Sequence, residues 1–97
     1  MVDRNWRHGR GELDLVCRDT DGTIVFVEVK SSRGAWAGDP GEWITPAKQR
    51  QVAKVALAWL VRHQETQANV RFDAVLLRIG QEPEHVIDAF RPEFGGF

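Results

Sequence analysis

The sequence predicts an α/β domain in which a mixed central sheet is flanked by one helix. Two strand-like segments precede a single stretch with helical periodicity, and two more strand-like segments follow it. The helical stretch is long enough to cross over between the two strand pairs, which allows parallel pairing. At 97 residues, with no internal repeat and no linker, the chain is expected to form one domain over residues 1–97.

The first strand pair is predicted from local patterns. Residues 12–17 largely alternate polar and apolar side chains, and residues 23–30 are rich in Val, Ile and Phe. Asp19, Thr20, Asp21 and Gly22 lie between them and are typical of a turn. We therefore expect a hairpin, preceded by a flexible lead-in at residues 9–11.

A helix is predicted after a long loop over residues 31–43. Thr45 suits the N-cap and Pro46 the first helical position, and the helix should run to about His63. Its inward stripe comprises Gln49, Val52, Ala53, Ala56 and Leu60, with Trp59 towards the edge.

Residues 70–79 and 85–90 are predicted as the third and fourth strands. The second strand is apolar on both faces, with Val25, Val27 and Val29 on one side and Ile24 and Phe26 on the other. Such a strand needs cover on both faces, whereas one helix is visible. Either a second helix is missing or a partner subunit supplies the cover, which favours a homodimer through the uncovered sheet face.

Composition narrows the class of protein. Apolar residues make up 42% and charged residues 28% of the chain, with a formal net charge of −1, which is typical of a globular protein. No segment is as apolar as a membrane-spanning helix or a signal peptide, and the single Cys17 excludes an internal disulfide framework. We therefore expect a cytoplasmic protein with no membrane partner. The charge argues against a nucleic-acid coat protein but is compatible with a nuclease, whose acidic site is offset by metal ions.

Candidate chemistry lies on the first hairpin. Glu12 and Asp14 share one face of the first strand, and Glu28 and Lys30 share one face of the second. Hairpin pairing would bring these side chains to one patch. Glu28 follows an apolar run, and its charge is costly to bury unless it has a partner or binds a metal. Oxygen ligands suit Mg²⁺ or Mn²⁺, so Asp14 and Glu28, with a backbone carbonyl near Val29, are the predicted metal ligands.

The chemistry suited to this set is hydrolysis of a phosphodiester. A bound metal lowers the pKa of a water and shields the scissile phosphate, and Lys30 would orient that water or stabilise the developing charge. The alternative is an ordinary ion pair between Glu28 and Lys30 on a solvated strand face, a common arrangement in sheets.

Several segments resemble the YraN-like family of small, largely uncharacterised bacterial proteins. The matching segments are Asn5–Arg7, Gly11–Val16, Val25–Lys30, Thr45–Lys48 and Val70–Val75. The resemblance implies a restriction-endonuclease-like fold, similar also to archaeal Holliday-junction resolvases, and the PD-(D/E)xK nuclease pattern. In that pattern Asp14 matches the first acid, Glu28 the second acid and Lys30 the lysine, while Glu12 matches a further acid of the family.

Members of this family usually begin with an additional helix ahead of Asn-Trp-Arg. No counterpart of that helix precedes Asn5, so we expect the N-terminal helix of the family to be absent. This expectation agrees with the uncovered sheet face inferred above. In such nucleases the N-terminal helix often carries a further acidic residue near the site.

Helix-borne Lys48 and Gln49 are candidate accessory residues, because in related nucleases such side chains contact the site or the phosphate. The alternative is a polar first helical turn. Arg4, Arg7 and Arg10 cluster ahead of the first acidic strand and predict contacts to a DNA backbone, against the alternative of solvated arginines on a frayed end.

Three further residues have two interpretations each, and a fourth, Asp73, has one. Ser32 follows Lys30 closely and could bond a DNA phosphate or belong to a strand-end turn. Trp36 and Asp39 could touch substrate or sit in a mobile loop. Asp73 lies inside the third strand, where a structural partnership with an arginine is favoured.

The sequence thus predicts a Mg²⁺- or Mn²⁺-dependent endonuclease that cuts DNA, including branched or otherwise structured DNA. The alternative is a catalytically silent module of the nuclease fold that binds nucleic acid or protein. A third possibility, compatible with both, is a structural domain that dimerises through its sheet face.

Overall fold

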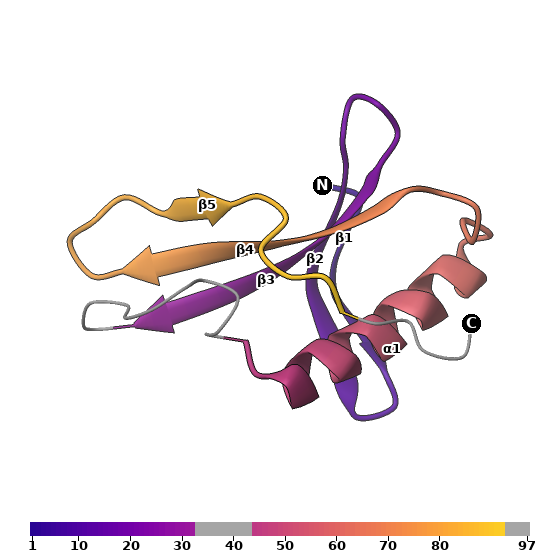
Figure 1. Cartoon of the computed structure of the whole chain (residues 1–97), viewed down its shortest axis with the longest axis horizontal. Coiled ribbons are helices and arrows are strands. Elements are labelled where there is room, and N and C mark those ends of the chain that lie inside the picture. The colour runs from indigo at the N-terminus through magenta and orange to yellow at the C-terminus, as the bar shows by residue number, and fades with distance from the viewer. Residues whose placement is uncertain (33–43, 93–97) are drawn as a thin grey trace.

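A computed structural model describes residues 1–32 and 44–92 and places five strands and one helix in these ranges (Figure 1). They are β1 (Asp3–His8), β2 (Gly11–Arg18), β3 (Ile24–Ser32), α1 (Pro46–Arg62), β4 (Val70–Arg78) and β5 (Glu84–Val86). The strands form one sheet in the order β1-β2-β3-β4-β5. Only β3 and β4 pair in parallel, so the predicted α/β class with a mixed sheet and one helix is confirmed.

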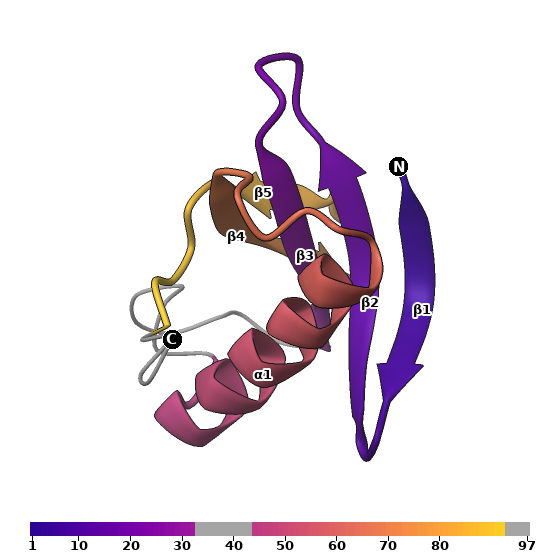
Figure 2. The same ribbon diagram turned by 90° about the vertical axis from the view of Figure 1, so that its right-hand side faces the viewer.

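Helix α1 lies across one face of the sheet and connects the parallel strands β3 and β4 (Figure 2). It begins where the sequence predicts, because the Thr45 side chain accepts a hydrogen bond from the backbone N–H of Lys48 at 3.2 Å and Pro46 opens the first turn. Trp59 is 1% exposed and therefore fully buried rather than at the edge of the stripe. Its indole N–H donates to Asp3 Oδ2 at 3.1 Å.

The hydrophobic core fills the space between α1 and the helix-facing side of the sheet. Its larger members are Leu13, Val16, Ile24, Phe26, Ile44, Val52, Val55, Trp59, Leu60, Phe72, Leu76 and Phe90. Gly11 marks a close approach of β2 to the helix, since a Cβ atom there would collide with the side chain of Val55. No helix in the described ranges is long and apolar enough to cross a membrane.

Strand β1 is not predicted by the sequence, and it replaces the frayed end given as the alternative for the arginines. Residues 9 and 10 of the expected flexible lead-in form the turn between β1 and β2. Strand β1 pairs antiparallel with β2, with Trp6 opposite Leu13, and Gly9 turns the chain at a φ of +60°. Asp3 and Trp6 both reach the helix side although they are three residues apart. The break falls at Asn5, whose φ is +50°. An odd spacing of inward residues hides the strand from any period-two pattern.

Strand β5 is shorter than the predicted residues 85–90. Asp88 adopts a φ of +55° and donates its backbone N–H to Asp73 Oδ1 at 2.9 Å, which turns the chain out of the strand. Phe90 then returns to the core, where it is 5% exposed. The apolar residue at the end of the segment is therefore buried from a loop and not from a strand.

The sheet face opposite α1 carries no helix within the described ranges, yet Val25 and Val27 are only 4% and 6% exposed. In the strand register these valines lie beside Arg71 and Asp73 of β4. Asp73 is fully buried, and Arg71 donates two hydrogen bonds to its carboxylate, at 2.8 and 3.0 Å. Asp73 therefore has the structural role that the sequence favours, and the burial of the two valines requires no partner chain.

Candidate functional site

Strand β2 changes face in the middle, and this break positions Asp14. Leu13 and Val16 are both buried in the core although they are three residues apart. Regular pairing with β3 covers only Leu15–Arg18. At the break, Asp14 Oδ2 accepts the backbone N–H of Val29 at 2.9 Å, so its carboxylate is held against β3 directly beside the next residue of interest, Glu28.

Glu28 comes from the central strand β3 and is 4% exposed. Its Oε1 atom is buried and has no hydrogen-bond partner among the described residues. The nearest cation recorded for this atom is Lys48 Nζ, an ion-pair distance of 3.9 Å that is too long for a hydrogen bond. A buried carboxylate oxygen without a partner is costly, which marks this position as unusual.

The electrostatics of Glu28 show which groups surround it. Burial, a hydrogen bond with Asp14 and the negative charge of Asp14 together raise the pKa of Glu28 to about 8. The positive charges of Lys48 and Lys30 act in the opposite direction. Asp14, Glu28, Lys30 and Lys48 therefore form one group, which we call the carboxylate cluster.

Three of the predicted catalytic residues thus gather at one place, together with the predicted accessory residue Lys48. Within the described residues, no group of three or more His, Cys, Asp or Glu side chains is arranged to hold a metal ion. The carboxylate cluster contains two carboxylates, those of Asp14 and Glu28. These are the two residues that the sequence predicts as metal ligands.

Two other predicted residues have different partners. Glu12 pairs with Arg7 at 3.0 Å across the β1–β2 ladder, so these two side chains engage one another. The side-chain amide of Gln49 donates to the backbone carbonyl of Ile44 at 2.8 Å and so helps to shape the start of α1.

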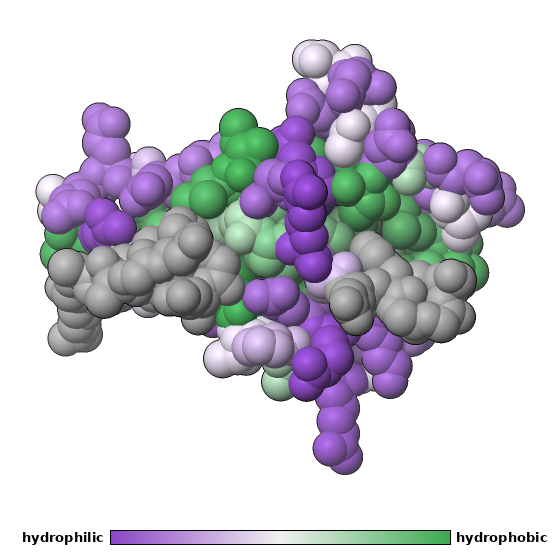
Figure 3. Space-filling model, in the orientation of Figure 1, coloured by the Kyte–Doolittle hydropathy of each residue, from purple (hydrophilic) through white to green (hydrophobic). Residues whose placement is uncertain are grey.

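The predicted DNA-contacting residues lie at scattered positions. Arg4 is exposed on β1, and Arg10 lies in the β1–β2 turn, whose tip is hydrophilic in Figure 3. Arg10 lines a pocket of about 250 Å³ together with Gln51 and Lys54 of α1. Ser32 ends β3, where it is in register with Arg78. Trp36 and Asp39 lie outside the described residues.

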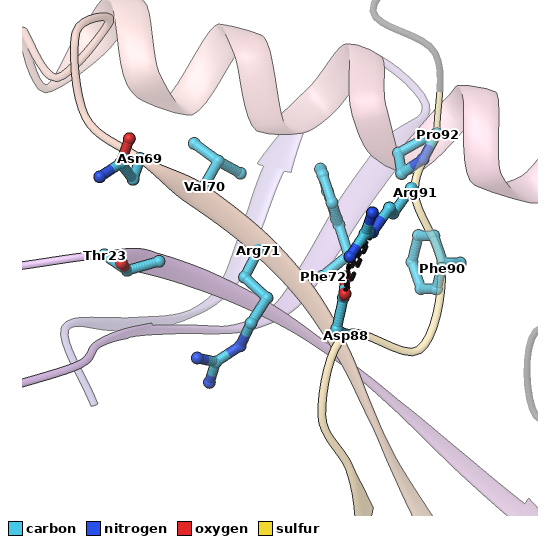
Figure 4. A pocket seen from close by; sticks show the side chains of 9 residues that line it. All are labelled: Thr23, Asn69, Val70, Arg71, Phe72, Asp88, Phe90, Arg91 and Pro92. Carbon is cyan, nitrogen blue, oxygen red and sulfur yellow. Dashed lines mark hydrogen bonds and ion pairs between the residues drawn. The ribbon is translucent and has the colours of Figure 1, made fainter.

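A second pocket, of about 360 Å³, lies at the other end of the parallel strands (Figure 4). Its lining includes Arg71 and Arg91, and both guanidinium groups are already bonded. Arg71 binds Asp73 and Asp19, and Arg91 binds Asp88 at 2.6 Å. The pocket lies at the start of β4, whereas Glu28 lies in register with Ala74 farther along it, so the pocket is separate from the carboxylate cluster.

Fold and site together define a small α/β domain in which a mixed sheet holds the buried Glu28 beside the partly buried Asp14 and two lysines. The chain belongs to the uncharacterised protein family UPF0102, whose sequence model matches residues 1–77. The resemblance to the YraN-like family is thereby confirmed at the level of the family.

Individual relatives are similar over nearly the whole chain. A UPF0102 protein of Rhodococcus opacus is 45% identical over 94 residues, which is 93% of this chain and 79% of the relative. A Geobacter sulfurreducens protein of the family is 46% identical over 94 residues, or 93% of this chain and 73% of the relative. One from Bifidobacterium longum is 45% identical over 91 residues, or 90% and 73%.

Proposed function

We propose that this protein is a metal-dependent nuclease of restriction-endonuclease-like fold that hydrolyses phosphodiester bonds in DNA. The observation that carries the proposal is the buried Oε1 of Glu28, which lacks a partner beside the carboxylate of Asp14. Two close carboxylates repel each other when both are ionised, and Glu28 therefore retains a proton in the absence of metal. A divalent cation would allow both to ionise while supplying the missing contact. An all-oxygen donor set suits Mg²⁺ or Mn²⁺.

In this proposal each residue of the carboxylate cluster has a distinct task. Asp14 and Glu28 hold the cation, which when bound supplies an activated water and shields the charge of the phosphate. Lys30 lies on the same strand as Glu28, two residues on, and orients the attacking water or stabilises the charge that develops. Lys48 approaches from the first turn of α1 and adds positive charge to the same place.

The pKa of Glu28 ties metal binding to pH. Without a cation, Glu28 keeps its proton up to a pH of about 8 because its charged form is buried beside Asp14. A metal that binds there must displace this proton, so affinity should rise with pH.

A silent binding module is the second candidate, and the approach of Lys48 favours it. The ammonium of Lys48, 3.9 Å from Glu28 Oε1, places a cation supplied by the protein where the metal would otherwise balance the charge. In that case the domain would bind nucleic acid or a protein, alone or as a homodimer, without cutting.

Cleavage assays separate the two candidates. Duplex, single-stranded and junction DNA are incubated with Mg²⁺ or Mn²⁺ and the wild type, Asp14→Asn, Glu28→Gln or Glu82→Gln. Asn at position 14 keeps an oxygen that can accept the Val29 N–H, so the sheet is preserved while the charge is lost. Glu82 is exposed and serves as the matched control.

The nuclease proposal expects cleavage by the wild type and Glu82→Gln and its loss in both site variants. Equal cleavage by wild type and Asp14→Asn would refute it. Titration calorimetry with Mn²⁺ gives the second readout: heat with the wild type but not with Glu28→Gln supports the metal site, and no heat at millimolar Mn²⁺ supports the silent module.

A further inference from the structure

Positive charge is concentrated on α1 and on the hairpin beside it. Helix α1 contains Lys48, Arg50, Lys54 and Arg62 and no acidic residue. The β1–β2 hairpin adds Arg4, Arg7 and Arg10, although it also carries Asp3, Glu12 and Asp14, and Arg7 is paired with Glu12. The chain as a whole has a net charge of −1, so this basic surface reflects placement and not composition.

A groove of about 680 Å³ runs between β1 and α1 within this basic surface. Figure 2 shows β1 as the outermost strand of the sheet, with α1 lying across the same sheet. The groove is lined by Trp6, Arg7, His8, Lys54, Leu57, Ala58, Val61 and Arg62. Its lining therefore combines aromatic rings, an apolar wall and three cationic side chains, and includes no carboxylate.

The aromatic part of the groove consists of two stacked rings. The rings of Trp6 and His8 are parallel to within 2°, with centroids 5.9 Å apart. Trp6 is half-buried, and His8 is exposed. On the opposite wall Val61 is 59% exposed. This combination of stacked rings, apolar wall and cations is absent from the carboxylate cluster.

We propose that this groove binds an unpaired segment of a nucleic acid, with a base stacked on the Trp6–His8 platform and phosphates held by Lys54 and Arg62. Proteins that bind single strands combine a positively charged groove with aromatic side chains on which bases stack. A duplex hides the faces of its bases, so a platform of this kind selects an unpaired strand.

Continuity with the neighbouring pocket favours a strand over a compact anion. Lys54 and His8 also line the pocket that contains Arg10, so cationic side chains continue from Arg62 past Lys54 to the hairpin tip. Lys54 and Arg62 are eight residues apart on α1, or about 12 Å along the helix axis. Such a track matches a polyanion with regularly spaced charges.

The inference rests on the proposed function for the identity of its ligand as a nucleic acid. It deepens that function by naming unpaired strands as the substrate class. Binding is measured in EDTA, without metal, so that it does not depend on cleavage. Loss of cleavage with retained binding would refute only the nuclease, and cleavage without groove binding would refute only the inference.

The experiment measures the fluorescence anisotropy of a labelled oligothymidylate of about a dozen nucleotides. An abasic oligomer of equal length and a duplex are the comparison ligands. The variants are Trp6→Leu, Trp6→Phe and Arg62→Ala. Arg91→Ala is the matched control because that arginine is 84% exposed in its side chain and lies outside the groove.

We expect Trp6→Leu to weaken binding of oligothymidylate by about 5- to 100-fold, the effect of one lost base–aromatic stack, and Trp6→Phe to weaken it less. Arg62→Ala should lower the slope of log affinity against log salt by about 0.7, and Arg91→Ala should leave it unchanged. The wild type should bind the abasic oligomer more weakly than oligothymidylate, a result that needs no variant to fold.

Three results would overturn the inference. The first is equal affinity of the wild type for the abasic oligomer and for oligothymidylate, which would leave only a charged patch. The second is tighter binding of the duplex than of the single strand. The third is displacement of oligothymidylate by polyglutamate at equal charge concentration, which would identify an acidic peptide as the better occupant.

Discussion

Replacing Glu28 by Gln should make the protein more stable at alkaline pH. Burial raises the pKa of Glu28 from 4.5 to about 8 in the folded chain. Between these values the folded protein keeps a proton that the unfolded chain releases, so the free energy of unfolding of the wild type falls as pH rises. Below pH 4.5 both states hold the proton, and above about pH 8 the loss is complete.

The size of the effect follows from the two pKa values. Their separation, at 1.36 kcal/mol per pH unit, corresponds to as much as about 5 kcal/mol. A domain of this kind has a total stability of about 5–15 kcal/mol, so the change is large. A Gln side chain cannot ionise, and its amide can donate a hydrogen bond to Asp14.

Urea unfolding followed by circular dichroism, repeated from pH 5 to pH 9, measures the difference between wild type and Glu28→Gln. Subtraction removes the contributions that are common to both proteins, and Glu82→Gln is the control for loss of an exposed carboxylate. Added Mn²⁺ at pH 8 should stabilise the wild type but not Glu28→Gln. Curves for the wild type and Glu28→Gln that stay parallel across the whole pH range would refute the buried-carboxylate argument.

Two further perturbations test the scaffold. Asp73→Asn should cost about 3 kcal/mol in urea unfolding, because Arg71 would lose its buried carboxylate partner; a cost no larger than that of Glu82→Gln would contradict this. Gly11→Ala should destabilise by about 1–3 kcal/mol because its methyl group meets Val55, and most of this cost should be recovered when the same change is made in a Val55→Ala background and compared with Val55→Ala alone. No recovery in thermal unfolding would show that the contact is not the cause.

Much of the fold could be predicted because the necessary signals are local. The β2–β3 hairpin is visible in alternation and β-branched runs, and α1 is visible in its cap and its stripe. Strand β1 was hidden by a left-handed residue at Asn5, which places Asp3 and Trp6 on one side despite their odd spacing. The end of β5 was hidden because a backbone bond to Asp73, distant in sequence, turns the chain at Asp88.

The candidate site shows the same division. The sequence nominates Asp14, Glu28 and Lys30 because strand periodicity and hairpin pairing are enough to bring them near one another. Periodicity does not predict the break in β2, the bond from Asp14 to the Val29 N–H, or the position of Lys48 Nζ beside Glu28. The groove between β1 and α1 could not be anticipated at all, because it requires a strand that the pattern conceals.

The bond between Asp14 and Val29 has a consequence for how this protein can change. One carboxylate has two roles, since Oδ2 accepts the Val29 N–H at a strand junction while the same group lies beside Glu28. A substitution that shortens this side chain removes the bond at the junction together with the charge beside Glu28, so the two losses cannot be separated by truncation. Only an exchange that keeps the acceptor while discarding the charge can uncouple the two.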